Sequence, residues 1–186
     1  MEFASPAWCE RYPTSALISD LIEPFRGNVE AFLAALAVGG ATVHIAATFR
    51  PPERAYLMHW CCQIAGYRRQ GVFTQAAPGD AELYPGVAID WTCGGDIGAA
   101  RAAAVAMREG YGIVYPAALV SRHTQRRAID MTIHVPAGST IADAHGNRST
   151  NLQAADGMTA SIIAIGKSFG VIKLLSDPPH WSDDGH

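Results

Sequence analysis

Two short segments of the sequence gather side chains that can bind a metal ion and transfer a proton. The first runs from Ser121 to Asp130 and contains His123, and the second is Asp177-Pro178-Pro179-His180-Trp181. Histidine is the commonest metal ligand, and a carboxylate can act as a ligand or as a general base. The two segments together therefore indicate a metal-dependent hydrolytic site.

Three of these side chains, His123, Asp130 and His180, match the ligand set of a catalytic zinc ion. Such an ion commonly has three His or carboxylate ligands and holds water in its fourth position, where the pKa of that water falls from about 16 to about 7. Asp177 lies on a loop stiffened by two prolines, so it can accept and return a proton without being a ligand. The alternative is that these histidines are ordinary structural residues, because chain spacing alone does not prove that the ligands meet.

Helices and strands are both predicted around these segments. Apolar residues recur at helical spacing in four stretches: residues 14–38 (in two pieces, the second capped by Asn28), 52–65, 97–108 and 158–169. Apolar or β-branched runs predict four strands: residues 42–48, 117–120, 128–135 and 171–175. Two Gly-, Pro- and Asp-rich stretches predict loops: residues 66–95 and 136–156. The mixture lacks a regular β-α-β alternation, so we expect one α+β domain over residues 1–186.

Composition excludes several classes of protein. The chain has 186 residues, of which 49% are hydrophobic and 17% charged, so it is not a disordered chain. A net charge of −3 disfavours general binding to nucleic acid, and no apolar run is long enough to span a membrane. We see no Sec signal peptide and therefore expect synthesis in the cytoplasm. The four cysteines form no CxxC pair. Cys61 and Cys62 are interpreted as buried packing residues, and a disulfide involving Cys9 or Cys93 is left open.

The two segments resemble the motifs of a known enzyme family. Ser121, His123, Ala128 and Asp130 match in register the SxHxxGxAxD signature of the zinc D-Ala-D-Ala carboxypeptidase and L-alanyl-D-glutamate endopeptidase family, the VanY-like group that includes phage endolysins. Residues 177–181 resemble its closing [DE]xxH motif, often DPPHW. The resemblance covers about residues 42–184 and implies a Hedgehog/DD-peptidase-like fold, an antiparallel sheet flanked by helices, with the helical segment at about 14–38 packed on it.

The resemblance also implies roles for single residues. His123, Asp130 and His180 resemble the ligands of one zinc ion, and Asp177 resembles the catalytic acid and base. Ser121 resembles the serine that supports the site near the first ligand.

Three further residues are candidates for contact with a substrate. Arg50 resembles the family arginine that holds a substrate carbonyl or carboxylate, and a cation there would stabilise a developing oxyanion. Its alternative interpretation is a solvated arginine at a helix start. Gln63 is a weaker candidate, on the helix that follows. Trp181 is either a packing wall or a substrate platform.

Two positions leave questions open. Arg126 stands where the family has glycine, which changes the bend if that glycine has a positive φ, and which puts substrate preference in doubt more than metal binding. His134 has the same strand parity as Asp130, so it either faces the cleft or is a core histidine.

The expected function is a zinc peptidase that hydrolyses peptidoglycan stem peptides, with an endopeptidase acting on L-Ala-D-Glu or the D-Ala cross-link favoured over a D,D-carboxypeptidase. A lysin exported by a holin, or an effector delivered by a secretion system, would act in the periplasm or at the cell wall. A monomer fits either scheme, and an effector would have a cognate immunity protein. The alternative is a non-catalytic, zinc-binding Hedgehog-like module that binds cell wall or a protein partner.

Overall fold

The computed structural model describes residues 1–186, and their contacts divide into two units. The sheet unit comprises Thr14–Arg50 and Arg122–His186, and the helical unit comprises Met1–Pro13 and Pro51–Ser121. The sequence predicts no boundary at these points, and a single domain over residues 1–186 stays a prediction. All four α-helices and the antiparallel strands agree with the predicted α+β class.

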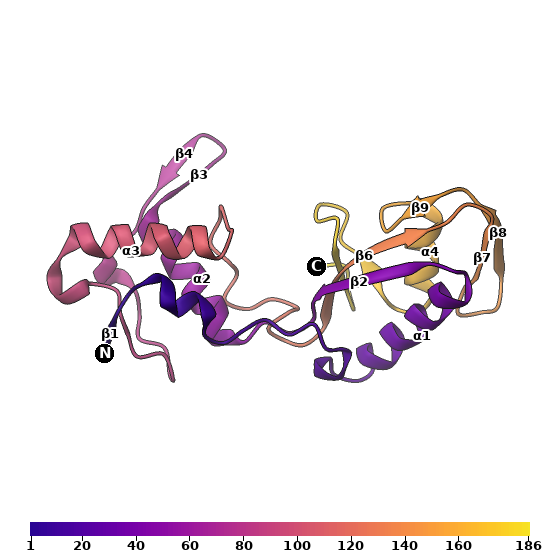
Figure 1. The fold of residues 1–186 in the computed structure, drawn as a ribbon, viewed down its shortest axis with the longest axis horizontal. Helices are drawn as coiled ribbons and strands as arrows, with labels where there is room; N and C mark the ends of the chain where they lie inside the picture. Colours follow the sequence, from indigo (N-terminus) through magenta and orange to yellow (C-terminus); the bar gives the residue numbers. More distant parts are fainter. The chain divides into compact units, whose positions relative to one another are not determined.

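Strand β6 (Ala128–Val135) is the centre of the main sheet (Figure 1). It pairs antiparallel with β2 (Thr42–Ala47) on one side. On the other side it pairs with β11 (His180–Ser182) near its start and with β9 (Ala155–Asp156) near its end. Strand β10 (Ile172–Lys173) extends the sheet beyond β11.

Alternation along β6 separates a core face from an open face. Ile129, Met131 and Ile133 are buried, whereas Thr132 and His134 are exposed. The core face packs against the 3-10 turn Ile18–Asp20 and two helices, α1 (Phe25–Val38) and α4 (Ala160–Ser168). The open face continues onto β2 with three exposed residues: Thr42, His44 and Ala46. A hairpin completes the unit, formed by β7 (Ser139–Ala142) and β8 (Arg148–Leu152).

The helical unit is built on two helices, α2 (Pro52–Ala65) and α3 (Ile97–Gly110). Pro52 occupies the first turn of α2, where its missing N–H is harmless, and the Asp96 carboxylate accepts the N–H of Ala99 as the cap of α3. The remaining elements are short: β1 (Glu2–Phe3), β3 (Tyr67–Arg69), β4 (Val72–Thr74), β5 (Ile89–Asp90) and the 3-10 turns Pro6–Glu10, Pro78–Asp80 and Cys93–Gly95. All four cysteines are free, and Cys61 and Cys62 are buried in α2 as predicted.

Most predicted elements are confirmed, and four predictions are wrong. The first predicted helical piece, before Pro24, forms only the 3-10 turn Ile18–Asp20, because Ser15 pairs in an extended conformation with Phe49. The second N-terminal helix begins at Phe25 rather than after Asn28, and the Glu23 carboxylate accepts the otherwise unpaired N–H of Gly27 in its first turn. Residues 117–120 form no strand, since no other strand pairs with them. The predicted loops contain two hairpins, β3–β4 and β7–β8. No helix has the length and apolarity needed to cross a membrane.

Candidate metal centre

His123, Asp130 and His180 converge in the sheet unit. The Nε2 atom of His123 lies 3.1 Å from Asp130 Oδ1 and 3.1 Å from Nδ1 of His180. The same His180 nitrogen lies 3.1 Å from Asp130 Oδ1. One atom from each side chain thus forms a nearly equilateral triangle, and this group could hold a metal ion.

Strand pairing accounts for most of this convergence. His180 of β11 is directly opposite Asp130 of β6, so the two side chains point to the same side of the sheet. Asp130 shares the open face with Thr132, because residues two apart on a strand face the same way. His123 comes from the turn before β6, where its carbonyl oxygen accepts the N–H groups of Arg50 (3.3 Å) and Arg126 (3.2 Å).

Backbone oxygens fix which ring nitrogen of each histidine faces the triangle. His123 Nδ1 lies 3.2 Å from the carbonyl oxygen of Thr48, and His180 Nε2 lies 3.0 Å from the oxygen of His186. Both oxygens only accept hydrogen bonds, so in the neutral imidazoles these ring nitrogens carry the proton and donate it. The opposite nitrogens, His123 Nε2 and His180 Nδ1, are then free to act as ligands.

Thr48 was not predicted as part of this site. It is fully buried at the end of β2, and its Oγ1 donates to the carbonyl oxygens of Ser15 (3.1 Å) and Leu17 (2.9 Å). Its own N–H donates to Ser15 at 2.7 Å. The segment before α1 therefore anchors the carbonyl that orients His123. A polar β-branched residue ending an apolar strand was the only sequence signal for this role.

The charges of the triad are strongly coupled. Burial opposes ionisation of the Asp130 carboxyl, but hydrogen bonds from His123 and His180, formed when protons occupy their facing nitrogens, prevail and hold its pKa well below the ordinary value. Burial lowers the pKa of His180, yet its hydrogen bonds to Asp130 and to the oxygen of His186 raise it above the ordinary value. An ionised aspartate facing two imidazole nitrogens is an arrangement that attracts a cation.

The donor set and its spacing fit a zinc ion. Two imidazoles and one carboxylate are common ligands of catalytic zinc. In a tetrahedral site with bonds of about 2.0–2.1 Å, ligand atoms lie about 3.3–3.4 Å apart. The three separations of 3.1 Å are within a few tenths of an ångström of that value. Only small side-chain adjustments are needed for the triad to bind the ion.

Asp177 and Arg50 lie in the same unit as the triad. Asp177 is exposed, its backbone oxygen accepts the N–H of His180 at 3.0 Å, and its charge helps to raise the pKa of His180. The backbone N–H of Arg50 donates to His123, and its side chain is half-buried. Both residues are therefore attached through the backbone to a ligand of the triad.

The other three predicted site residues have different outcomes. Ser121 and Gln63 belong to the helical unit, so their roles in a site of the sheet unit stay predictions. Trp181 is fully buried, with its ring 5.6 Å from that of Phe32. The packing interpretation of Trp181 is therefore right, and a substrate platform is excluded because no part of the ring is accessible.

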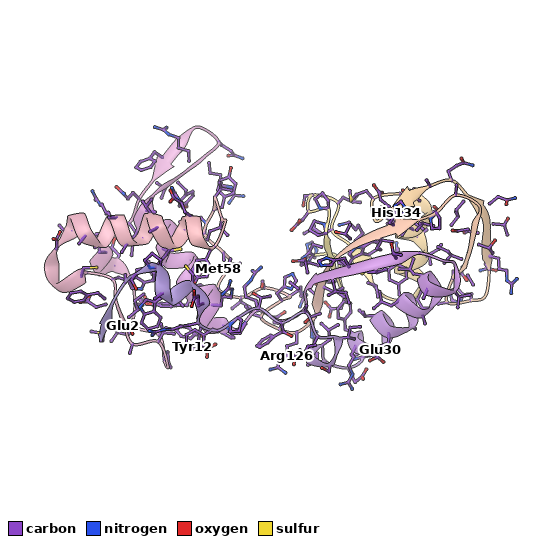
Figure 2. The ribbon with its side chains drawn as sticks, viewed as in Figure 1. Glu2, Tyr12, Glu30, Met58, Arg126 and His134 are labelled. Atoms are coloured by element: carbon purple, nitrogen blue, oxygen red, sulfur yellow. The ribbon has the colours of Figure 1, made fainter.

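The structure shows the conformation of Arg126 and the exposure of His134, the two points that the sequence left open. Arg126 has φ of 62°, so the bend keeps a left-handed conformation although arginine occupies it, and its guanidinium stacks over Phe49 at 4.3 Å. His134 lies exposed on β6, on the same face as Asp130, which excludes a core histidine (Figure 2). A functional role for His134 stays a prediction.

Comparisons with known proteins identify no relative. No family model, no curated protein and no solved structure matches this chain.

Proposed function

We propose that this protein is a zinc-dependent peptidase that hydrolyses peptidoglycan stem peptides as an endopeptidase. The observation that supports it best is the triangle of His123 Nε2, Asp130 Oδ1 and His180 Nδ1, each 3.1 Å from the other two. The backbone oxygens that fix both imidazole tautomers add to this support, because such partners are typical of metal-binding histidines. The choice of peptidoglycan rests on the resemblance of the two motifs to the VanY-like family.

Asp177 and Arg50 would have separate catalytic roles beside the zinc ion. Zinc, when bound, supplies a Lewis acid and lowers the pKa of a water molecule. Asp177 is exposed and three residues before His180, so its carboxylate can take the proton of the attacking water and pass it to the leaving amine. Arg50, held by its N–H on the carbonyl of His123, provides a cation for the negative charge that develops on the substrate oxygen.

The open face of the sheet is a suitable floor for an extended peptide. Asp130, Thr132 and His134 follow one another along this face of β6, and a hollow of about 280 Å³ borders Pro178 and Pro179. The proposal therefore includes the finer fold assignment, a Hedgehog/DD-peptidase-like sheet with its metal at one end of the open face, and a place of action at the cell wall.

The test is digestion of purified peptidoglycan followed by mass analysis of the products. The zinc-loaded protein is expected to release new amino termini, and the product masses identify the L-Ala-D-Glu bond or the D-Ala cross-link. Asp177→Asn should retain zinc and lower kcat at least 100-fold, because a positioned proton carrier contributes about 10²–10⁴-fold.

Glu30→Gln is the matched control for Asp177→Asn. Glu30 is an exposed carboxylate on α1, which packs against the opposite face of the sheet (Figure 2). This variant should keep full activity. A zinc-loaded protein that releases no amines, and whose Asp177→Asn variant behaves identically, would leave the non-catalytic zinc-binding module as the function. Release of single terminal D-Ala would make it a carboxypeptidase.

A further inference from the structure

Lys173 is a buried lysine beside the metal centre. It lies on β10 opposite Trp181 of β11, and only 5% of its surface is exposed. The chain has one other lysine, Lys167, which is exposed on α4. Burial of an ammonium group is costly unless hydrogen bonds replace its water. The position of Lys173 therefore requires compensating partners.

Three backbone oxygens supply those partners. Lys173 Nζ donates to the carbonyl oxygens of Leu174 (2.7 Å), Asp177 (2.5 Å) and His180 (2.8 Å). An ammonium group has three protons, so these bonds satisfy it completely. Leu174 and Asp177 belong to the loop that joins β10 to β11, and His180 is the first residue of β11, where that loop ends.

The same three oxygens also hold the loop's own hydrogen bonds. Leu174 accepts the N–H of Asp177 (3.2 Å), Asp177 accepts that of His180 (3.0 Å), and His180 accepts that of Leu174 (3.1 Å). These three hydrogen bonds form a closed ring, and the ammonium of Lys173 binds all three of its carbonyl oxygens. Two prolines in the loop donate no N–H, which leaves few other bonds to define its shape.

We propose that Lys173 is a positioning residue, which fixes the loop so that His180 Nδ1 faces His123 and Asp130 while Asp177 stays beside them. Lys173 contacts neither a ligand atom nor a substrate. It acts through the backbone of Asp177, the proposed proton carrier, and of His180, the proposed metal ligand. Its effect on metal binding rests on the proposed function, whereas its effect on the loop does not.

Hydrogen exchange in the metal-free protein tests the effect on the loop. Lys173→Met keeps the length of the side chain and removes its donors, and Lys167→Met makes the same change at an exposed position. Lys173→Met should speed exchange at the amides of Leu174, Asp177 and His180 by about tenfold or more, while Lys167→Met leaves them unchanged. Equal exchange in both variants would overturn the proposal.

Zinc affinity of the folded protein tests the consequence for the site. Competition with a chromogenic chelator should show about 10–100-fold weaker zinc binding by Lys173→Met, the usual effect of losing a partner that orients a ligand. A purely structural lysine would lower the unfolding midpoint and leave this affinity unchanged.

Two further outcomes separate the proposals. If the wild-type protein binds no zinc, the proposed function fails, while hydrogen exchange still decides whether Lys173 holds the loop. If Lys173→Met does not fold, Lys173→Gln replaces it, since an amide retains two N–H donors and should loosen the loop to an intermediate degree. Lys173→Gln indistinguishable from Lys167→Gln in exchange and zinc affinity would refute the positioning role.

Discussion

His123 and His180 are 57 residues apart in the chain, yet Nε2 of one lies 3.1 Å from Nδ1 of the other. Their rings meet edge to face at 76°, with centroids 4.9 Å apart. The other nitrogen of each ring donates its proton to a backbone oxygen, so in the neutral imidazoles the two facing nitrogens both present lone pairs. Two lone pairs at this distance repel each other unless a proton or a metal ion lies between them, so the arrangement favours binding of a cation.

Removal of one ligand should therefore abolish metal binding. We expect wild type to bind one zinc ion and His123→Ala to bind none, measured as zinc per chain after dialysis. At free zinc of 100 times its Kd, wild type should gain about 2.7 kcal/mol in free energy of unfolding, or roughly 5–10 °C in its midpoint. The control is His145→Ala, an exposed histidine of the same unit, which should behave as wild type.

The pKa shifts in the triad predict opposite pH trends with and without metal. The raised pKa of His180 contributes stability below the ordinary histidine pKa of about 6.5, and this contribution is lost as the pH rises. The lowered pKa of Asp130 contributes above about 3.9 and is lost as the pH falls. Metal-free protein should thus lose more stability from His180→Gln at pH 5.5 than at pH 8, in urea unfolding.

Zinc reverses this trend because protons compete with the metal for the histidine nitrogens. The stabilisation by zinc should be larger at pH 8 than at pH 5.5. Equal stabilisation at both values would mean that neither histidine is a ligand.

Thr48 links the segment before α1 to the orientation of His123. Thr48→Val keeps the shape of the side chain but removes the hydroxyl donor to the backbone oxygens of Ser15 and Leu17, which should cost about 0.5–1.5 kcal/mol in the free energy of unfolding. Thr48→Ser retains the hydroxyl and should cost less than half as much. Chemical denaturation measures both, and a Thr48→Val protein as stable as wild type would refute this anchor.

Arg126 occupies a left-handed bend that favours glycine. Arg126→Gly removes about 1–2 kcal/mol of backbone strain, but it loses the stacking on Phe49 and adds flexibility to the unfolded chain, so the net change should stay within about 1 kcal/mol. Arg126→Val, β-branched in the same conformation, should cost about 2 kcal/mol. Zinc affinity should be unchanged in both, since no ligand is lost. A loss of stability from Arg126→Gly as large as that from Arg126→Val would contradict the strain argument.

The sequence predicted the metal ligands better than it predicted the residues that hold those ligands in place. His123, Asp130 and His180 were identifiable because metal chemistry restricts the residue types, and the strand at 128–135 because its apolar residues recur. Lys173 was missed because a lysine in a short strand looks like an exposed residue, and only the loop's three-dimensional shape makes its amine a donor to three oxygens. Thr48 was missed for the same reason, since its role passes through a backbone carbonyl.

The division of the chain into units likewise had no sequence signal. The three proposed ligands span residues 123–180, and their spacing in the chain does not show which other segments assemble the site. All three ligands, together with Thr48 and Lys173, belong to the sheet unit. Long-range pairing of β2 with β6 brings its two chain segments together, and periodicity cannot reveal such pairing.

The sheet unit should therefore bind zinc without residues 52–120. The backbone N–H of Arg50 donates to His123 at 3.3 Å, so the two ends of this stretch approach each other and a short glycine linker can join them. We expect the shortened protein to bind one zinc ion with an affinity within about tenfold of wild type, measured by chelator competition, and to lose it on His180→Ala. Removal of residues 177–186 from the full chain should abolish zinc binding, because it deletes a ligand. Full zinc occupancy after that second deletion, or none in a folded sheet unit, would show that the ligands are assigned wrongly.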